Sequence, residues 1–220
     1  MEQIPAPAKE RLLYLMRLLE NIGNKETITS ARIEALTGWA SHTIRKDISF
    51  LGATAPCSGE APSSHADSWS GRPGSSGGYD PVALVSLIKK ALGLDRRRLF
   101  CIVGLGRLGS AYLKLPELIG AEFELAAGFD TNVNRTEILA SPVPLYPAYK
   151  MGEVISRFGI GLALLCVPPE AAQIAAERLA AAGIRGILNF APIAITVPQG
   201  VVVKNVYLAD ELRALAIKIP

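Results

Sequence analysis

Three glycines at the spacing G-x-G-x-x-G follow an apolar run over residues 99–103, which has the length of a buried strand. Residues 108–115 after them are predicted to form a helix. The first glycine permits a tight turn, the second lets the backbone approach a pyrophosphate, and the third lets helix and sheet pack closely. Free N–H groups at the helix start attract phosphate. The predicted contacts with a dinucleotide come from Gly104, Leu105, Gly106, Arg107, Leu108 and Gly109.

A carboxylate stands where such a site needs one. Asp130 ends a second apolar run, residues 123–129, and lies 21 residues after Gly109. It can accept hydrogen bonds from a ribose diol and would repel a 2′-phosphate; because no Arg follows it directly, the sequence favours NAD(H) over NADP(H). An ATPase-type phosphate loop is disfavoured, since Ser110 stands where the Lys belongs. A glycine-rich turn that merely packs a helix on a sheet is the alternative.

The rest of this region alternates strands with helices, the pattern of an α/β fold with a parallel, Rossmann-like sheet. The expected strands are 99–103, 123–129, 143–146, 162–167, 186–190 and 201–203, and the expected helices are 108–115, 151–158, 170–182 and 208–219. Ligands of such sheets bind beyond the carboxyl ends of the strands. Those ends include Val167 and Pro168 after one strand and Asn189 to Pro192 after another.

The N-terminal third predicts short helices over residues 8–21, 30–36 and 41–51, preceded by an extended segment over residues 4–7. The second and third helices flank a turn at Gly38, which suggests a helix-turn-helix, with Ser41 capping the third helix. Ile44, Ile48 and Leu51 share one side of this helix. Hydrogen-bonding side chains suited to phosphates and guanine edges gather on the opposite side and at the helix start: Ser41, His42, Thr43, Arg45, Lys46 and Ser49. An ordinary helical domain with a solvated polar face is the alternative.

Residues 53–78 contain no Leu, Ile, Val, Met or Phe and are rich in Ser, Gly, Ala and Pro. Such a segment buries too little apolar surface to order itself, so we expect a flexible insert. A helix over residues 81–92 follows it. The expected domains are therefore 1–98, which contains the insert, a dinucleotide-binding domain over 99–207, and a final helix within 208–220.

Composition sets broad limits. The chain has 220 residues, is 50% hydrophobic and carries a formal net charge of +3, so the charge favours no partner class. Three widely spaced cysteines do not form a disulfide framework. The N-terminus has no hydrophobic signal region and no apolar run reaches the length of a membrane span, so we expect a cytoplasmic protein without a membrane partner.

Several separated motifs resemble the Rex family of redox-sensing bacterial repressors over nearly the whole chain except the insert. They are Ser41-His-Thr-Ile-Arg-Lys-Asp-Ile-Ser-Phe-Leu-Gly52, Gly78-Tyr79, Gly104-Leu-Gly-Arg-Leu-Gly109, Phe129-Asp130, Val167-Pro-Pro-Glu-Ala171 and Gly186-Ile-Leu-Asn-Phe-Ala-Pro192. The resemblance implies a winged helix-turn-helix joined to a Rossmann domain, and a homodimer in which the C-terminal helix exchanges between subunits. It also implies binding of double-stranded operator DNA at low NADH and release when NADH rises.

The resemblance also implies residue roles. DNA recognition would fall to Ser41, Thr43, Arg45 and Lys46, to which the wing adds Arg72 and Tyr79. The nicotinamide end of NAD(H) would lie near Val167, Pro168, Asn189, Phe190, Ala191 and Pro192.

Three positions depart from the family pattern. The wing carries the long insert, and Leu115 and Tyr207 stand where the family tends to have Tyr and Asp, a pair thought to couple nucleotide state to subunit rotation. Three functions therefore stay open: an NADH-responsive repressor, a DNA-binding dimer with a structural nucleotide site, and an NAD-dependent oxidoreductase. An enzyme is disfavoured, because no substrate domain follows the dinucleotide fold and both histidines, His42 and His65, lie outside it.

Overall fold

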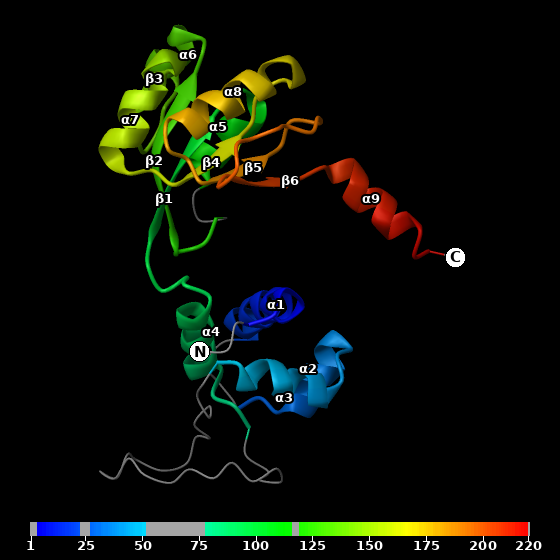
Figure 1. Ribbon diagram of the computed structural model, residues 1–220. Coiled ribbons are helices and arrows are strands. Elements are labelled where there is room, and N and C mark those ends of the chain that lie inside the picture. The colour runs from blue at the N-terminus through cyan, green and yellow to red at the C-terminus, as the bar shows by residue number, and fades with distance from the viewer. Residues whose placement is uncertain (1–3, 23–26, 52–77, 116–118, 220) are drawn as a thin grey trace, which may run out of the picture. The chain divides into compact units, whose positions relative to one another are not determined.

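The computed structural model describes residues 4–22, 27–51, 78–115 and 119–219. The chain divides into two compact units, Met1–Arg96 and Arg97–Pro220, the first helical and the second built on a sheet (Figure 1). The helices of the first unit are α1 (Ala6–Ile22), α2 (Ser30–Thr37), α3 (Ser41–Ser49) and α4 (Pro81–Ala91). The strands of the second are β1 (Arg98–Val103), β2 (Phe123–Asp130), β3 (Leu145–Pro147), β4 (Leu162–Leu165), β5 (Gly186–Asn189) and β6 (Val202–Asn205). Its helices are α5 (Arg107–Lys114), α6 (Val133–Ile138), η2 (Ala148–Lys150), α7 (Met151–Phe158), α8 (Pro169–Ala181) and α9 (Leu208–Ala216).

The helical unit buries one apolar stripe from each of its four helices. Along α1, α3 and α4 the core residues recur at three- and four-residue spacing, as an amphipathic helix requires, whereas α2 buries Ile33 alone. They include Leu12, Leu15, Leu19, Ile33, Ile44, Ile48, Leu84 and Ile88. The expected extended segment over residues 4–7 is wrong in part: α1 begins at Ala6, since Pro7 in the first turn lacks only an N–H that has no intrahelical acceptor there.

Local chemistry defines the second and third helices. Thr29 caps α2 by accepting a hydrogen bond from the Arg32 N–H at 3.1 Å, and Gly38 at φ +73° ends it in the left-handed conformation. The expected cap at Ser41 is wrong: the N-cap of α3 is Ala40, and Ser41 is the first helical residue.

A half-buried ion pair ties α1 to α3. Arg11 Nε and Nη2 donate to the two carboxylate oxygens of Asp47 at 2.6 Å and 2.8 Å. Asp47 is 4% exposed, on the side of α3 that also buries Ile44 and Ile48. This bidentate contact compensates the Asp47 carboxylate for the loss of water and fixes the orientation of α3.

The sheet of the second unit has the order β3-β2-β1-β4-β5-β6, and each neighbouring pair is parallel. This is the doubly wound Rossmann-like order, which reverses direction between β1 and β4. Successive residues of β1 point to opposite faces of the sheet. Cys101 and Val103 join the core on one face, whereas Phe100 and Ile102 join the core on the other. Burial on both faces explains why β1 reads as a continuous apolar run.

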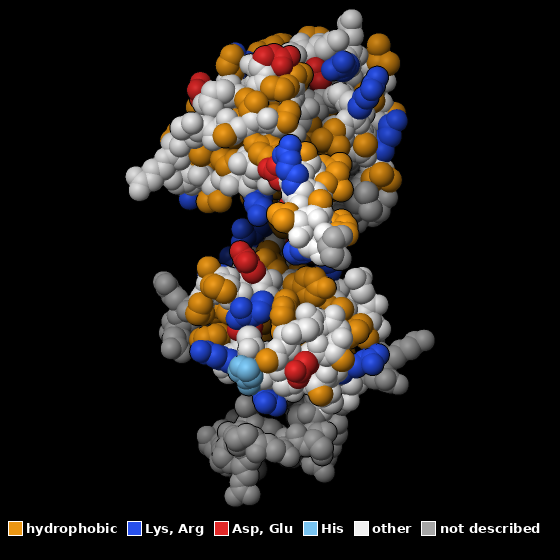
Figure 2. Space-filling model, turned by 90° about the vertical axis from the view of Figure 1, so that its right-hand side faces the viewer, with side chains coloured by type: hydrophobic (Ala, Val, Ile, Leu, Met, Phe, Trp, Pro, Cys, Tyr) orange, Lys and Arg blue, Asp and Glu red, His pale blue; other side chains and the backbone are white. Residues whose placement is uncertain are grey.

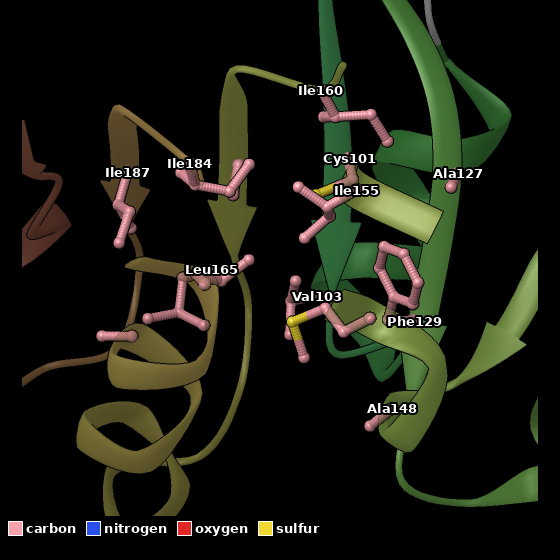
Figure 3. Packing of buried hydrophobic residues seen from close by; sticks show 14 of the residues in the cluster. Cys101, Val103, Ala127, Phe129, Ala148, Ile155, Ile160, Leu165, Ile184 and Ile187 are labelled. Atoms are coloured by element: carbon pink, nitrogen blue, oxygen red, sulfur yellow. The ribbon is translucent and has the colours of Figure 1, made fainter. Parts of the chain in front are cut away.

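The first face is covered by α7 and α8 and forms the larger core (Figure 3). Figure 3 shows Val103 and Phe129 from neighbouring strands converging below Cys101 and Ile155. The other face carries α5, whose Leu113 is fully buried against Phe100 and Ile102.

The last helix carries an uncovered apolar side. None of the described residues of α9 is buried, and the helix projects beyond the edge strand β6 (Figure 1). Large apolar side chains are more than half exposed at Leu208, Leu212, Leu215 and Ile219. The side of the molecule from which α9 projects shows such hydrophobic side chains in orange (Figure 2).

Most of the insert, including Arg72, lies outside the described residues, and of the two predicted wing contacts only Tyr79 is described. Among the helices that are described, none is long and apolar enough to cross a membrane. The sequence pattern gave no indication of α6, which follows directly after β2.

The ion pair between α1 and α3 generates a stability prediction. Arg11→Met keeps the unbranched stem but leaves the buried Asp47 carboxylate without its two donors, so we expect a loss of about 2 kcal/mol in the free energy of unfolding. The matched control, Arg97→Met, removes an exposed ion pair with Glu124 at 3.7 Å and should change stability by less than about 0.5 kcal/mol. Urea denaturation followed by circular dichroism measures both, and equal losses would contradict the assignment.

Candidate functional site

A pocket of about 780 Å³ opens at the carboxyl ends of β1, β2 and β4, where the strand order reverses. Sheets of this order bind ligands at this point. The predicted site residues that line it are Gly104, Gly106, Arg107, Leu108, Asp130, Val167, Pro168, Phe190 and Pro192. Residues from four separate stretches of the chain therefore meet in one cavity, as the sequence predicted. Its volume is that of a site for a whole organic ligand.

The three glycines of the loop meet different constraints. Gly104 has φ +92°, and a Cβ there would lie 2.6 Å from the Cys166 carbonyl oxygen. A Cβ on Gly109 would lie 1.9 Å from the Gly104 carbonyl oxygen, so only glycine lets α5 begin so close to β1. Gly106 is different, because a Cβ there would meet no described atom within 4 Å and its φ of −68° suits any residue.

The open space beside Gly106 therefore lies in the pocket and not in the protein core. Gly106 is also the N-cap residue of α5. Because glycine has no side chain, no side-chain cap hydrogen bond is made at the start of this helix among the described residues. Unpaired N–H groups at a helix start, facing a cavity, fit a phosphate. This loop thus has both the room and the donors that a pyrophosphate needs.

Asp130 is held in a fixed position at the end of β2. Its Oδ2 accepts a hydrogen bond from the Leu105 N–H at 2.7 Å, and its Oδ1 accepts one from the Asn132 N–H at 2.8 Å. The residue is 5% exposed and lines the pocket. A carboxylate oxygen accepts more than one hydrogen bond, so both oxygens keep acceptor capacity for a ribose diol.

Two arginines that are not among the predicted contact residues also line the pocket. Arg135 Nη1 lies 3.5 Å from Asp130 Oδ2, and Arg178 lines the pocket from α8. Arg135 follows Asp130 by five residues and stands on the unpredicted helix α6. The turn of this helix returns Arg135 to the carboxylate, so a search for an Arg directly after Asp130 could not find it.

Four predicted contact residues lie behind the pocket wall. Leu105 and Gly109 support the loop, and Ala191 is 1% exposed. Asn189 is fully buried: its Nδ2 donates to the Ile193 carbonyl at 2.9 Å and to Asn205 Oδ1 at 3.0 Å, and its Oδ1 accepts from the Ala191 N–H at 3.0 Å. The Asn189 side chain thus shapes the loop that carries Phe190 and Pro192.

Cys166 brings a thiol to the pocket wall. Burial in apolar surroundings disfavours the thiolate and raises the pKa of Cys166 to about 12. At neutral pH the thiol is therefore protonated and weakly nucleophilic. A protonated thiol in these surroundings acts as part of an apolar pocket wall and not as a redox-active cysteine.

The helical unit presents a second candidate surface on α3. His42, Arg45, Lys46 and Ser49 are exposed, and the opposite side of the helix is buried against α1. Blue Lys and Arg side chains are visible on the surface of this unit in Figure 2. A helix that exposes cations and hydroxyls in this arrangement is suited to DNA phosphates and base edges.

The other residues that are predicted to contact DNA are less exposed to solvent. Ser41 and Thr43 are half-buried, and the Ser41 hydroxyl donates to Glu34, which also accepts from the Ser41 N–H at 3.2 Å. The sequence pattern did not predict this role of Glu34, whose carboxylate lies at the positive N-terminal end of α3. Tyr79 forms an antiparallel bridge with Ile28 and packs partly buried against the helical core.

Two glycine variants distinguish a glycine that the ligand requires from a glycine that the fold requires. Gly106→Ala places a methyl group in open pocket space, so we expect unchanged stability, within about 0.5 kcal/mol, and at least about tenfold weaker NADH binding. Gly109→Ala drives a methyl group into the Gly104 carbonyl and should cost about 2 kcal/mol or more. Thermal denaturation and NADH fluorescence titration measure these effects, and wild-type affinity in Gly106→Ala would contradict the pocket assignment.

Each of the two units matches its own protein-family model. Residues 3–49 match a family model described as "Putative DNA-binding protein N-terminus". Residues 96–193 match a model described as "CoA binding domain".

Whole-chain relatives agree with one another. The chain is 32% identical over 216 residues to the redox-sensing transcriptional repressor Rex of Levilactobacillus brevis, covering 97% of this chain and 93% of the relative. It is 32% identical over 215 residues to Rex of Bacillus licheniformis, covering 97% and 92%.

Solved structures give the same result. The chain resembles RSP, a Rex-family repressor, in its complex with β-NAD⁺ and operator DNA, at 27% identity and a TM-score of 0.81, covering 98% of this chain and 92% of RSP. It resembles the β-NADH complex of RSP at 26% identity and a TM-score of 0.79, covering 100% and 95%. With these identities over nearly its whole length, the chain belongs to the Rex family of redox-sensing transcriptional repressors.

Proposed function

We propose that this chain is a DNA-binding repressor that senses the NADH/NAD⁺ ratio and leaves its operator when NADH binds. The observation that carries the proposal is the coexistence, in one chain, of the pocket beside Asp130 and the exposed cationic face of α3. RSP, which is similar along the whole chain, has been crystallised with NAD⁺ and operator DNA and with NADH. A repressor acts where the chromosome lies, so the proposal includes a cytoplasmic location.

The pocket residues have the chemistry to hold NAD(H). The loop from Gly104 to Gly109 and the start of α5 would hold the pyrophosphate through backbone N–H groups. Asp130 would accept hydrogen bonds from the adenosine ribose, and the apolar wall of Val167, Pro168 and Phe190 would face the nicotinamide. When bound, the nicotinamide supplies a ring that is cationic in NAD⁺ and neutral in NADH.

The difference between the two nicotinamide states must be read by the protein. A ligand shifts a conformational equilibrium only if it binds the two conformations with different affinity. An apolar wall such as Val167 and Pro168 favours the neutral ring of NADH over the cationic ring of NAD⁺, because burying an unpaired charge is costly. NADH is therefore the form expected to stabilise the conformation that releases DNA.

Recognition of DNA would use the exposed side of α3. Arg45 and Lys46 can contact phosphates or guanine edges, while the ion pair between Arg11 and Asp47 holds the helix from behind. His42 and Ser49 would add polar contacts. Any contribution of Arg72 and the wing belongs to the same proposal.

A homodimer is the second part of the proposal. The apolar side of α9 is uncovered within the described chain, and a two-fold dimer buries the same surface of both copies. The groove on the sheet face opposite α7 and α8, lined by Phe100, Leu164 and Leu188 with Arg98 and Lys204 at its edge, offers about 630 Å³ for such a helix. Glu211 in the first turn of α9 complements these cations, while Asp210 pairs with Arg213 of the same helix at 2.5 Å.

A second candidate, a DNA-binding dimer with a structural nucleotide site, is favoured by one observation. Leu115 is 42% exposed at the end of α5, and the buried Tyr207 hydroxyl has no hydrogen-bond partner among the described residues. Where the family pattern has a polar pair at these positions, this chain offers only one polar group. In this candidate NADH binds but does not release DNA.

Direct titration distinguishes the two candidates. A duplex selected from a random-sequence pool by the intact protein should be two-fold symmetric, and saturating NADH should weaken its binding by at least about tenfold more than NAD⁺ does. Arg45→Ala should weaken binding by about tenfold and reduce its dependence on salt, whereas the control Arg157→Ala in the other unit should do neither. NADH binding without any effect on DNA affinity would leave the structural candidate, and binding of neither ligand would reject both.

Two substitutions to lysine on α9 test the predicted dimer. Leu212→Lys places a charge on the apolar side of α9 and should convert the dimer to a monomer, because an unpaired buried charge opposes the interface. Ala214→Lys puts the same group on the opposite side and should leave the dimer intact. Sedimentation equilibrium measures both, and a wild-type monomer or an unaffected Leu212→Lys dimer would contradict the role of α9.

A further inference from the structure

The first residue of α3 is hydrogen-bonded to a carboxylate on the preceding helix. The Ser41 N–H donates to Glu34 Oε2 at 3.2 Å, and the Ser41 hydroxyl donates to the same oxygen. Ala40, the N-cap residue of α3, makes no side-chain cap hydrogen bond. Glu34 therefore supplies, from α2, the acceptor that the start of α3 does not provide for itself.

The turn between α2 and α3 fixes this contact. Gly38 ends α2 at φ +73°, and its N–H donates to the Glu34 carbonyl at 2.8 Å. The Thr37 hydroxyl donates to the Ile33 carbonyl at 2.8 Å and accepts a hydrogen bond from the Trp39 N–H at 3.2 Å. Because these contacts reverse the chain within a few residues, the Glu34 carboxylate is held at the start of α3.

The contact with Glu34 uses the only hydrogen of the Ser41 hydroxyl. A serine hydroxyl has one O–H donor and two acceptor lone pairs, whereas an ionised carboxylate only accepts hydrogen bonds. The hydrogen between the two side chains must therefore come from Ser41. Among the described residues, Ser41 is the hydrogen-bond partner of the Glu34 side chain. Toward any further partner the two side chains together present acceptors alone.

This pair of side chains lies at the end of α3 that is suited to read base edges. The N-terminal residues of a recognition helix contact bases in the major groove. Arg45 follows Ser41 by one helical turn, and both Arg45 and His42 are exposed on the side proposed to face DNA. Glu34 is exposed and Ser41 is half-buried, so a base that approaches the start of α3 meets the oxygens of both.

The four bases differ in what they offer to such acceptors. In the major groove, adenine presents the N6 amino group and cytosine the N4 amino group, whereas guanine presents acceptors at N7 and O6 and thymine an acceptor at O4. A serine hydroxyl that is not already bonded can contact either kind of group. With its hydrogen donated to Glu34, the Ser41 hydroxyl can contact only an amino group. The negative charge of Glu34 also repels a carbonyl oxygen at the same place.

We propose that Glu34 is a specificity-determining residue for DNA: by holding the hydrogen of the Ser41 hydroxyl, it restricts the base that this hydroxyl contacts to adenine or cytosine. The inference rests on the proposed DNA-binding role of α3. Glu34 acts as a positioning residue, and Ser41 makes the contact with the base. Removing the carboxylate relaxes the choice of base at one position and leaves the rest of the operator unaffected.

Substituted operators locate the base that Ser41 contacts. A duplex selected from a random-sequence pool by the intact protein is changed at each position in turn, in both half-sites, to the other base pairs. The position whose preference disappears in Ser41→Ala is the one that Ser41 reads. Its preferred pair contains one amino group in the major groove, on adenine or on cytosine. Replacing that base by purine or 2-pyrimidinone deletes the amino group, which should weaken wild-type binding by about fivefold and Ser41→Ala binding by less than about twofold.

The role of Glu34 is tested at the same position. A transition there exchanges the amino group for a carbonyl oxygen and should weaken wild-type binding by about fivefold or more. Glu34→Ala should reduce this penalty to less than about twofold, because the Ser41 hydroxyl can then donate as well as accept. Glu153→Ala, which removes an exposed carboxylate from α7 in the other unit, should keep the full penalty. Thermal denaturation checks that each variant is folded.

The outcomes distinguish base selection from a purely structural role. An unchanged transition penalty in folded Glu34→Ala would overturn the proposal, because the carboxylate would then only stabilise the start of α3. Full wild-type binding after deletion of the amino group, or a Ser41→Ala variant that changes the preference at no position, would also overturn it. Failure of the wild type to bind any duplex would instead reject the DNA-binding function on which the proposal rests.

Discussion

The hydrogen bond from the Leu105 N–H to Asp130 Oδ2, at 2.7 Å, joins the glycine loop to the end of the next strand. It is buried, so losing it would leave Asp130 Oδ2 without its backbone donor in a site of low dielectric. Together with the hydrogen bond from the Gly104 N–H to the Phe129 carbonyl at 2.8 Å, it makes the turn after β1 and the carboxyl end of β2 two walls of the same pocket. The close approach of α5 to β1, which requires Gly109, and the open space beside Gly106 depend on the loop being held in this position.

Much of this arrangement could be predicted from residue types and spacing. Strands buried on both faces are apolar throughout, and their carboxyl ends meet at one edge of a parallel sheet, so Gly104, Asp130 and Val167 had to lie near one another. The amphipathic pattern of α3 likewise separated Ile44 and Ile48 from the exposed Arg45 and Lys46. These features follow from local periodicity and from the topology rules of α/β sheets.

Other features depend on contacts that spacing does not reveal. Helix α6 is short and has no buried residue, so no periodic pattern predicts it or the position of Arg135 beside Asp130. Asn189 ends a strand at the ligand edge, as predicted. Its side-chain amide, however, makes hydrogen bonds to other residues of the chain. Ser41 has the right residue type for a helix cap, yet its hydroxyl donates to Glu34, because Ala40 already occupies the cap position.

The proposed function depends on the pocket beside Asp130 holding a pyridine dinucleotide. Calorimetry of NADH with the intact chain and with Asp130→Ala tests this most directly, with thermal denaturation to check that the variant is folded. The account predicts about one NADH per chain for the wild type and at least about a tenfold loss of affinity in the folded variant. Absence of binding to the wild type, or undiminished affinity in the variant, would contradict it.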